Sequence, residues 1–223
     1  MKALVTHSIQ AILFDCDGTL VDSEVPGMDV IHQQATALGV SCTREQAHQQ
    51  FRGLRMAECI DWIAAQLPQV PDGFAQDFAR NVRAAQALRF AEGLDVIPGA
   101  FELLDALRIP FCVATNGPRE KVELTLGLTG LRGFFPEHIF SAYEVGSFKP
   151  DPGLFLHAAQ QLGVAPVHCA VVEDSLPGIQ AGLAAGMQVF SLLPPAGLPL
   201  AWRESVVCIR TLRDLDALLH APA

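Results

Sequence analysis

Two pairs of carboxylates in this sequence could hold a metal ion. Asp15 and Asp17 are two residues apart in the segment Asp-Cys-Asp-Gly, and Glu173 and Asp174 are adjacent in Glu-Asp-Ser. Like charges within a few ångströms raise each other's pKa, so four neighbouring carboxylates need a compensating cation. An all-oxygen set without His or Cys suits Mg²⁺ better than Zn²⁺. These four acids therefore predict a magnesium site.

Three further residues indicate that the metal would act on a phosphoryl group. Thr115 offers a hydroxyl, Asn116 an amide and Lys149 a compact positive charge. Lysine is scarce in the chain, with three in 223 residues: Lys2, Lys121 and Lys149. A cation, a lysine and neutral hydrogen-bond donors are what phosphoryl transfer requires. We therefore expect Thr115, Asn116 and Lys149 to bind the phosphoryl group or the substrate that carries it.

The spacing of the first two acids also suggests a mechanism. An aspartate beside Mg²⁺ can attack phosphorus and form an aspartyl-phosphate, which divides one difficult step into two. A carboxylate two residues later can protonate the leaving alkoxide and then deprotonate the hydrolytic water. We expect Asp15 to be the nucleophile and Asp17 the general acid and base. Gly18 would permit the turn that directs Asp17 toward the leaving group.

Short apolar segments place these residues along one edge of a sheet. Such segments occupy residues 11–14, 110–114, 138–141, 169–172 and 188–192, and helical patterns at 100–107, 154–162 and 179–185 alternate with them. This alternation predicts an α/β fold: a Rossmann-like three-layer core with a mostly parallel sheet. Ligands of such sheets bind beyond the carboxyl ends of the strands, where the polar groups lie. We interpret Ser175 as the N-cap of the helix that follows it.

Residues 25–94 interrupt this alternation. They contain helical patterns at 28–38, 44–51, 56–67 and 74–90 and no convincing strand. We expect an inserted helical cap over 25–94, with residues 1–24 and 95–223 forming the α/β core. The insert holds six of the 15 basic residues, all arginines. Arg52 and Arg55 are the ones we expect to bind an anionic substrate; the alternative is that they are solvated helix charges.

Four motifs, taken together, resemble those of the haloacid dehalogenase-like hydrolase superfamily, in its order and spacing. They are the segment 15–24, Thr115-Asn116, Lys149-Pro-Asp-Pro and Glu173-Asp174-Ser. The resemblance implies that Asp15 is the nucleophile, that Asp17 is the acid/base, and that Thr115 and Lys149 bind the phosphoryl group. It further implies that Mg²⁺ is held by Asp15, the backbone carbonyl of Asp17 and Asp174, with support from Glu173. The helical insert resembles that family's cap.

Softer motifs narrow the resemblance to bacterial sugar phosphatases. Asn116-Gly-Pro, the turn at 51–53 and the segment 148–152 imply a small phosphorylated metabolite as substrate, with 6-phosphogluconate as one candidate. One alternative is a β-phosphoglucomutase-like mutase, which would carry a His where this chain has Pro-Gly-Met at 26–28. Another is a non-catalytic phosphate-binding module, which would gain nothing from Asp17. The complete set of acids favours a Mg²⁺-dependent phosphatase.

Composition excludes several other classes. A net charge of −9 argues against a nucleic-acid partner, which would require clustered basic residues. The apolar segments are much shorter than the roughly 20 residues that span a bilayer, so we expect no membrane insertion. Six cysteines without a CxxC pair and no visible leader pattern predict a reduced, cytoplasmic protein. We expect a monomer or a weak dimer.

Overall fold

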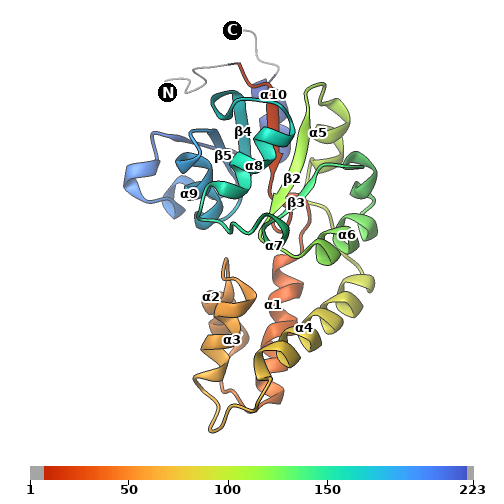
Figure 1. Cartoon of the computed structure of the whole chain (residues 1–223), viewed down its shortest axis with the longest axis vertical. Helices are drawn as coiled ribbons and strands as arrows, with labels where there is room; N and C mark the ends of the chain where they lie inside the picture. Colours follow the sequence, from red (N-terminus) through yellow and green to blue (C-terminus); the bar gives the residue numbers. More distant parts are fainter. Residues whose placement is uncertain (1–7, 220–223) are drawn as a thin grey trace. The chain divides into compact units, whose positions relative to one another are not determined.

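The computed structural model describes residues 8–219, and within them six strands form one parallel sheet. Its order is β3-β2-β1-β4-β5-β6. Figure 1 labels β2, β3, β4 and β5 of this sheet. The strands are β1 Ala11–Phe14, β2 Phe111–Thr115, β3 Ile139–Ser141, β4 Cys169–Glu173, β5 Gln188–Ser191 and β6 Val206–Cys208. The predicted mostly parallel sheet is confirmed, and every pairing is parallel. The sequence did not predict β6, a three-residue strand at one edge.

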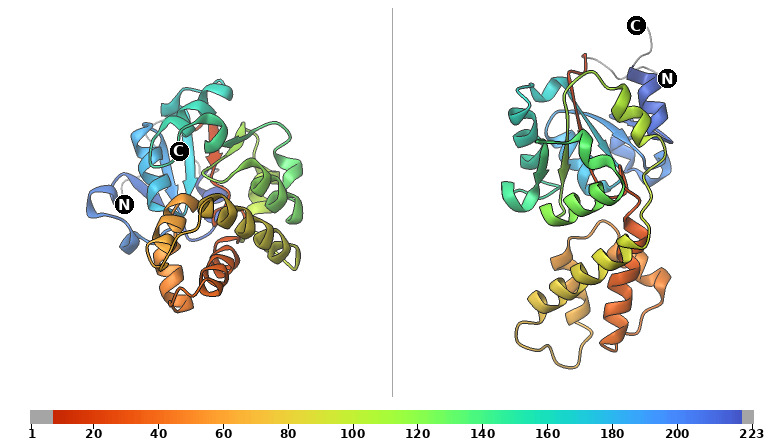
Figure 2. Two further views of the ribbon diagram at one scale, coloured as in Figure 1. Left: turned by 60° about the horizontal axis from the view of Figure 1, so that its bottom comes forward. Right: turned by 90° about the vertical axis from the view of Figure 1, so that its right-hand side faces the viewer.

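Helices cover both faces of this sheet. The longer ones are α5 Ala100–Ala106, α6 Arg119–Leu128, α8 Gly153–Gln161, α9 Leu176–Ala184 and α10 Leu212–Leu219, and the short α7 spans Ala142–Val145. Short 3-10 helices occupy Leu131–Phe134, Pro166–His168, Pro195–Gly197 and Leu200–Trp202. The right-hand view of Figure 2 shows teal α8 on one side of the sheet and lime α5 with blue α10 on the other. The predicted three-layer core is confirmed.

Alternate residues of the strands supply the core on each face. Leu13, Ala114 and Val171 are fully buried and pack with Phe155 of α8 and Ile179 of α9. The strands β1 and β4 are buried along their whole length, as expected for the centre of a parallel sheet. A continuous apolar run is therefore what marks these strands in the sequence.

The strand order creates a switch point beside β1. From β1 the chain proceeds to β2 and β3 on one side, whereas β4, β5 and β6 lie on the other. Phe14 pairs with Val172, so the next residues, Asp15 after β1 and Glu173 at the end of β4, lie side by side. A switch point in an open α/β sheet is where ligands bind. The first and fourth groups of polar residues meet there.

Residues 23–94 form a second compact unit, inserted between β1 and β2. Its helices are α1 Glu24–Ala37, α2 Arg44–Phe51, α3 Met56–Ala64 and α4 Phe74–Ala91. Phe74, Phe78 and Val82 form the buried stripe of α4 and pack with Ile31 and Ile63 in a core of their own. A hydrophobic face repeating every three to four residues is the sequence signal for such helices. The insert is helical as predicted.

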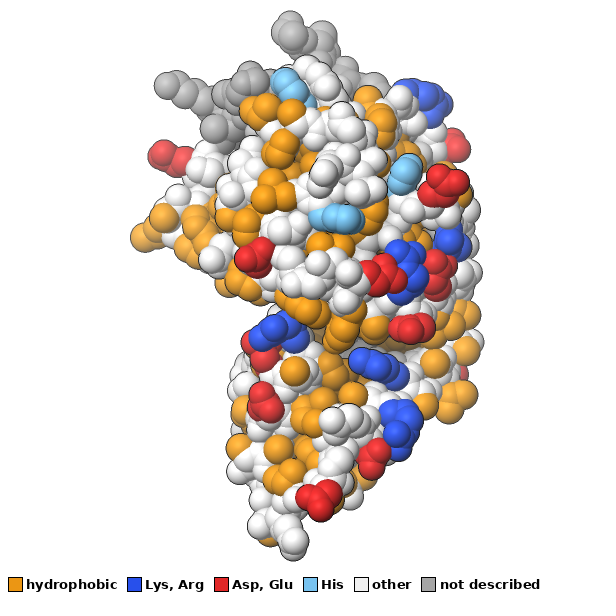
Figure 3. All heavy atoms as spheres, viewed as in Figure 1, with side chains coloured by type: hydrophobic (Ala, Val, Ile, Leu, Met, Phe, Trp, Pro, Cys, Tyr) orange, Lys and Arg blue, Asp and Glu red, His pale blue; other side chains and the backbone are white. Residues whose placement is uncertain are grey.

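Charges on this helical unit are mixed in sign. On the face shown in Figure 3, blue and red side chains are interspersed over the unit. One cluster connects two helices, because Asp29 of α1 accepts hydrogen bonds from Arg44 of α2 at 2.6 and 2.9 Å. His48 of α2 lies 2.7 Å from the same carboxylate.

No helix among residues 8–219 combines the length and apolarity needed to cross a membrane.

Candidate active site

Lys149 lies between two carboxylates at the carboxyl edge of the sheet. Its ammonium donates to Asp15 Oδ1 at 2.5 Å and to Glu173 Oε1 at 2.6 Å. All three side chains are buried, and Glu173 has no exposed surface. Charges removed from water require partners, and here one cation compensates two anions. The two acids come from β1 and β4, and the lysine comes from the loop that precedes α8.

Glu173 is held from both ends of its carboxylate. While Oε1 accepts from Lys149, Oε2 accepts the N–H of Asp174 at 3.1 Å, the N–H of Ser175 at 3.1 Å and the Ser175 hydroxyl at 2.8 Å. Ser175 is also the N-cap of α9, as expected, since its Oγ accepts the N–H of Gly178. A Cβ on Gly178 would lie 1.8 Å from Glu173 Oε1, so this glycine makes room for the acid. Glu173 therefore fixes the position of the Lys149 ammonium.

Asn116 holds the backbone on which Lys149 is carried. Its Oδ1 accepts the N–H of Lys149 at 2.9 Å, and its Nδ2 donates to the Lys149 carbonyl at 3.2 Å. The peptide bond between Lys149 and Pro150 is cis. Thr115, at the end of β2, is almost completely buried, and its Oγ1 accepts the N–H of Gly117 at 3.0 Å. The second and third groups of polar residues are thus joined at the same edge as Asp15.

Asp174 approaches the turn that follows β1. Thr19 donates its hydroxyl to Asp174 Oδ1 at 3.0 Å. Gly18 has a φ of +79°, and a Cβ at this position would lie 2.1 Å from Asp174 Oδ2. Only glycine combines that backbone conformation with so close an approach. Asp174 is therefore held beside the 15–18 segment, as the sequence predicted for a shared acidic site.

Asp17 has a partner that the sequence analysis did not identify. Lys121, in the first turn of α6, donates to Asp17 Oδ2 at 2.7 Å. The two side chains are 25% and 22% exposed, so the ion pair is shielded from water without being fully buried. A Cβ on Gly117 would lie 3.6 Å from the same oxygen. The scarcity of lysine could have singled out Lys121 in the sequence. Its pairing with Asp17 depends on the turn between β2 and α6, which the sequence did not predict.

Burial and charge shift the pKa values of these groups in opposite directions. Burial raises the pKa of Asp15 to about 7, and the charge of Lys149 opposes that rise. Burial alone would lower the pKa of Lys149, but Asp15 and Glu173 hold it above its ordinary value. Lys121 behaves in the same way, since Asp17 outweighs the effect of burial on its pKa. Both lysines are therefore cationic at neutral pH.

Three acids could together hold a metal ion. Asp15, Glu173 and Asp174 each offer an oxygen, and these oxygens all lie within 4.8 Å of one another. The donors are hard carboxylate oxygens, which suit a cation such as Mg²⁺. Because Glu173 uses both oxygens in hydrogen bonds, Asp15 and Asp174 are the better suited ligands of the three. The acidic cluster fits the predicted cation.

The two arginines expected to bind substrate lie in the helical unit. Arg52 follows α2, with its Nε 3.9 Å from Glu24 Oε2. Arg55 precedes α3 and donates to Glu58, which also caps that helix. Both are partly exposed and paired with acids of their own unit, and their role in substrate binding stays a prediction.

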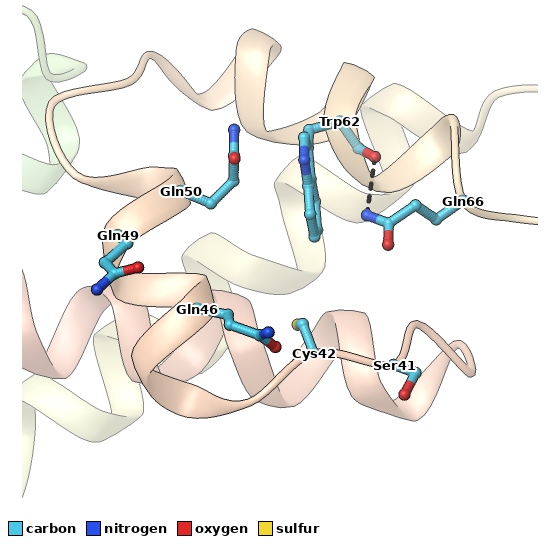
Figure 4. A pocket seen from close by; sticks show the side chains of 7 residues that line it. All are labelled: Ser41, Cys42, Gln46, Gln49, Gln50, Trp62 and Gln66. Atoms are coloured by element: carbon cyan, nitrogen blue, oxygen red, sulfur yellow. Dashed lines mark hydrogen bonds between the residues drawn. The ribbon is translucent and has the colours of Figure 1, made fainter.

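The helical unit also contains a pocket, of about 390 Å³. Figure 4 shows Gln46, Gln49, Gln50 and Gln66 around the ring of Trp62, with Ser41 and Cys42 at one side. Gln66 donates to the Trp62 carbonyl at 3.2 Å. None of the lining side chains carries a charge, so this pocket lacks the cation that a phosphoryl group requires. The residues predicted to bind the phosphoryl group lie instead at the carboxyl edge of the sheet.

Comparison with known proteins decides the family. Residues 9–186 match the family described as haloacid dehalogenase-like hydrolase. The chain belongs to this family. It is 37% identical to 6-phosphogluconate phosphatase of Escherichia coli K12 over 82% of its own length and 81% of the relative's. It is also 31% identical to hexitol phosphatase A of the same organism, over 95% of this chain and 91% of that one.

A solved structure supports the same assignment. A HAD family hydrolase from Deinococcus radiodurans R1, with bound phosphate and sodium, is 33% identical, with a TM-score of 0.71. The alignment covers 96% of this chain and 99% of that one. This haloacid dehalogenase-like protein is accordingly a phosphatase, a phosphoric monoester hydrolase. The expected family, fold and enzyme class are confirmed.

Proposed function

We propose that this phosphatase hydrolyses the phosphate ester of a small sugar or sugar acid through an aspartyl-phosphate on Asp15, with 6-phosphogluconate as the specific substrate. The observation that carries the proposal is the buried contact between Asp15 and Lys149. This contact supports the proposal because a carboxylate that could act as the nucleophile lies beside a cation that could hold phosphoryl oxygens. The substrate class is supported by the names of the relatives, a 6-phosphogluconate phosphatase and a hexitol phosphatase.

The reaction divides into two displacements at phosphorus. In the first, an oxygen of Asp15 forms a bond to phosphorus as the ester P–O bond breaks, and Asp17 gives its proton to the leaving alkoxide. In the second, Asp17 removes a proton from water as the water oxygen attacks phosphorus. The bond between Asp15 and phosphorus then breaks, which releases inorganic phosphate and restores the carboxylate. Thr115 and Lys149 bind the phosphoryl oxygens in both steps.

A divalent cation completes the site in this proposal. Asp15, Asp174 and the backbone carbonyl of Asp17 would hold Mg²⁺, with Glu173 supporting them through Lys149 and the backbone. When bound, Mg²⁺ neutralises the charge of the phosphoryl oxygens and of the crowded carboxylates. Removing the metal with EDTA should abolish turnover, and Mg²⁺ should restore it.

In this proposal, Asn116 and the two arginines, rather than the acids, select the substrate. Asn116 would contact the substrate in addition to holding Lys149. Arg52 and Arg55 would bind the anionic end of a sugar acid, because a guanidinium pairs well with a carboxylate. Under this proposal Arg52→Ala and Arg55→Ala raise KM for 6-phosphogluconate more than for an uncharged hexitol phosphate.

The test is a panel of phosphorylated metabolites assayed for phosphate release with Mg²⁺. We expect 6-phosphogluconate to have the highest kcat/KM and Asp15→Asn to lose activity by about 1000-fold or more. Asp105→Asn, which alters an exposed aspartate of α5, is the matched control and should behave as the wild type. Activity that survives Asp15→Asn would contradict the nucleophile, and a preference for nucleotides or phosphoproteins would contradict the substrate class.

A further inference from the structure

The ion pair between Lys121 and Asp17 joins two segments that are 104 residues apart in the chain. The turn 116–118 ends β2 and starts α6, so that Lys121 occupies the first turn of that helix. Its ammonium lies 2.7 Å from Asp17 Oδ2. Two residues before Lys121, Arg119 pairs with Glu144 instead, with Nε 2.5 Å from Oε1. One helix turn therefore contributes one cation to the catalytic edge and one to an exposed ion pair.

The two described lysines pair with different acids of the site. Lys149 contacts Asp15 and Glu173, whereas Lys121 contacts Asp17. Lys149 is taken up by Asp15 and Glu173, so among the described lysines it is Lys121 that offsets the charge of Asp17. Losing Lys121 would remove this attraction while the repulsion from Asp15 remains, which would shift the Asp17 carboxylate away from its present position. The position of Asp17 thus depends on a residue outside the four motifs.

We propose that Lys121 is a positioning residue that fixes the Asp17 carboxylate where it can exchange a proton with the leaving group and with water. This inference rests on the function proposed above, because it concerns the acid/base step of that reaction. Lys121 acts through Asp17 and does not itself contact the reacting atoms. A displacement of about 1 Å in a catalytic group can cost on the order of 100-fold in rate, so a positioning residue has a measurable effect.

The chemistry of the leaving group separates this role from a structural one. A sugar alkoxide is a poor leaving group and needs the proton of Asp17, whereas p-nitrophenolate departs without one. Loss of Lys121 should therefore slow the first step for a sugar phosphate more than for p-nitrophenyl phosphate. For p-nitrophenyl phosphate the second step, in which Asp17 activates water, becomes limiting. An initial burst of p-nitrophenolate should then precede a slower steady state.

The experiment compares Lys121→Met, Lys121→Arg and Arg119→Met on both substrates. We expect Lys121→Met to lower kcat for the sugar phosphate by about 100-fold with little change in KM, and to lower the burst rate with p-nitrophenyl phosphate by less than about tenfold. Lys121→Arg keeps a cationic donor and should recover part of the loss. Arg119→Met removes an ion pair from the same helix turn and should leave both activities unchanged.

A double-mutant cycle covers the case in which Lys121→Met folds poorly. In an Asp17→Asn background, Lys121→Gln should have little further effect on the residual activity, because the residue it positions is already disabled. A p-nitrophenolate burst rate that fell as much as kcat for the sugar phosphate, or a full additional loss in the Asp17→Asn background, would overturn the inference. Failure of the proposed function would look different. In that case Asp15→Asn would keep its activity, and Lys121→Met would still lower kcat.

Discussion

The ammonium of Lys149 lies 2.6 Å from Glu173 Oε1, and both side chains are almost completely removed from water. The same ammonium contacts Asp15, the proposed nucleophile. Glu173 is in turn fixed by the backbone and by Ser175 at the start of α9. The position of Lys149, the proposed phosphoryl-binding cation, is thus set by the core of the protein. It follows that stability and activity should be coupled at this pair.

Lys149→Met should damage both properties. It leaves two buried carboxylates without their cation, a loss that costs about 3 kcal/mol or more in free energy of unfolding. It also removes the charge proposed to hold phosphoryl oxygens, so kcat/KM should fall by about 100-fold or more. Urea denaturation and steady-state kinetics on the same preparation measure the two effects.

The double variant Lys149→Met/Glu173→Gln separates these contributions. Neutralising Glu173 removes one of the two stranded charges, so part of the lost stability should return, while activity should stay at the level of Lys149→Met. If the second substitution destabilised the protein further, the carboxylate of Glu173 would not be the charge that Lys149 compensates. Recovery of activity would contradict the role of Lys149 in binding the phosphoryl group.

Gly178 offers a second test of how Glu173 is held. A Cβ at this position would overlap the Glu173 carboxylate at 1.8 Å, so Gly178→Ala must displace the acid or the start of α9. We expect a loss of stability of roughly 1–3 kcal/mol, of the kind caused by overpacking, together with reduced activity. Gly127→Ala is the control, since a Cβ there meets nothing within 4 Å. Without a clash, that helical substitution should stabilise the protein by about 0.4–1 kcal/mol.

Sequence patterns predicted those residues of the candidate site that lie at the ends of strands. Asp15, Thr115 and Glu173 each follow or end a continuous apolar run, and parallel strands bring their carboxyl ends to one edge. Which side chains pair with one another depends on the turns and on where helices begin, and an apolar run in the sequence does not reveal these. Lys121 and its pairing with Asp17 required the turn between β2 and α6, and α6 itself was not predicted. The strand β6 was not predicted because its three residues, one buried and two half-buried, form too short a pattern.

The contact of Asp29 with Arg44 and His48 predicts that an interaction between α1 and α2 stabilises the helical unit at neutral pH and is lost in acid. Arg44 holds the pKa of Asp29 below its ordinary value of 3.8. A carboxyl group with a lower pKa in the folded state contributes stability that is present above pH 3.8 and disappears as the pH falls through the lowered value. Asp29→Asn should therefore lower the melting temperature at pH 7, and the difference from the wild type should shrink at acidic pH.

Asp77→Asn is the matched control for that experiment. It removes the exposed pair of Asp77 with Arg80, which lies within a single helix. Exposed pairs of this kind contribute little, so its melting temperature should differ little from the wild type at either pH. A difference between Asp29→Asn and wild type that grew on acidification would contradict the sign of the Asp29 shift.

The free cysteines should fall into two classes of reactivity. All six are unpaired by disulfides; Cys42 and Cys208 are half-buried, and Cys16, Cys59, Cys112 and Cys169 are buried. Burial raises the pKa of Cys59 to about 12 and that of Cys169 to about 11, and thiolates are the reactive form. At pH 8 a thiol reagent should label two cysteines quickly, and the other four only when the protein opens.

Two measurements decide this last prediction. Denaturation in guanidinium should expose six thiols, and Cys42→Ser should reduce the fast class from two to one. Because the raised pKa values belong to the folded state, ionisation favours the opened state once the pH passes the ordinary thiol value of 9.0, so raising the pH toward 10 should accelerate the slow class. Rapid labelling of more than two thiols at pH 8 would mean that the sheet or the helical core opens more readily than its burial implies. Protection of Cys112 in β2 and Cys169 in β4 in particular reports on the sheet that carries the candidate active site.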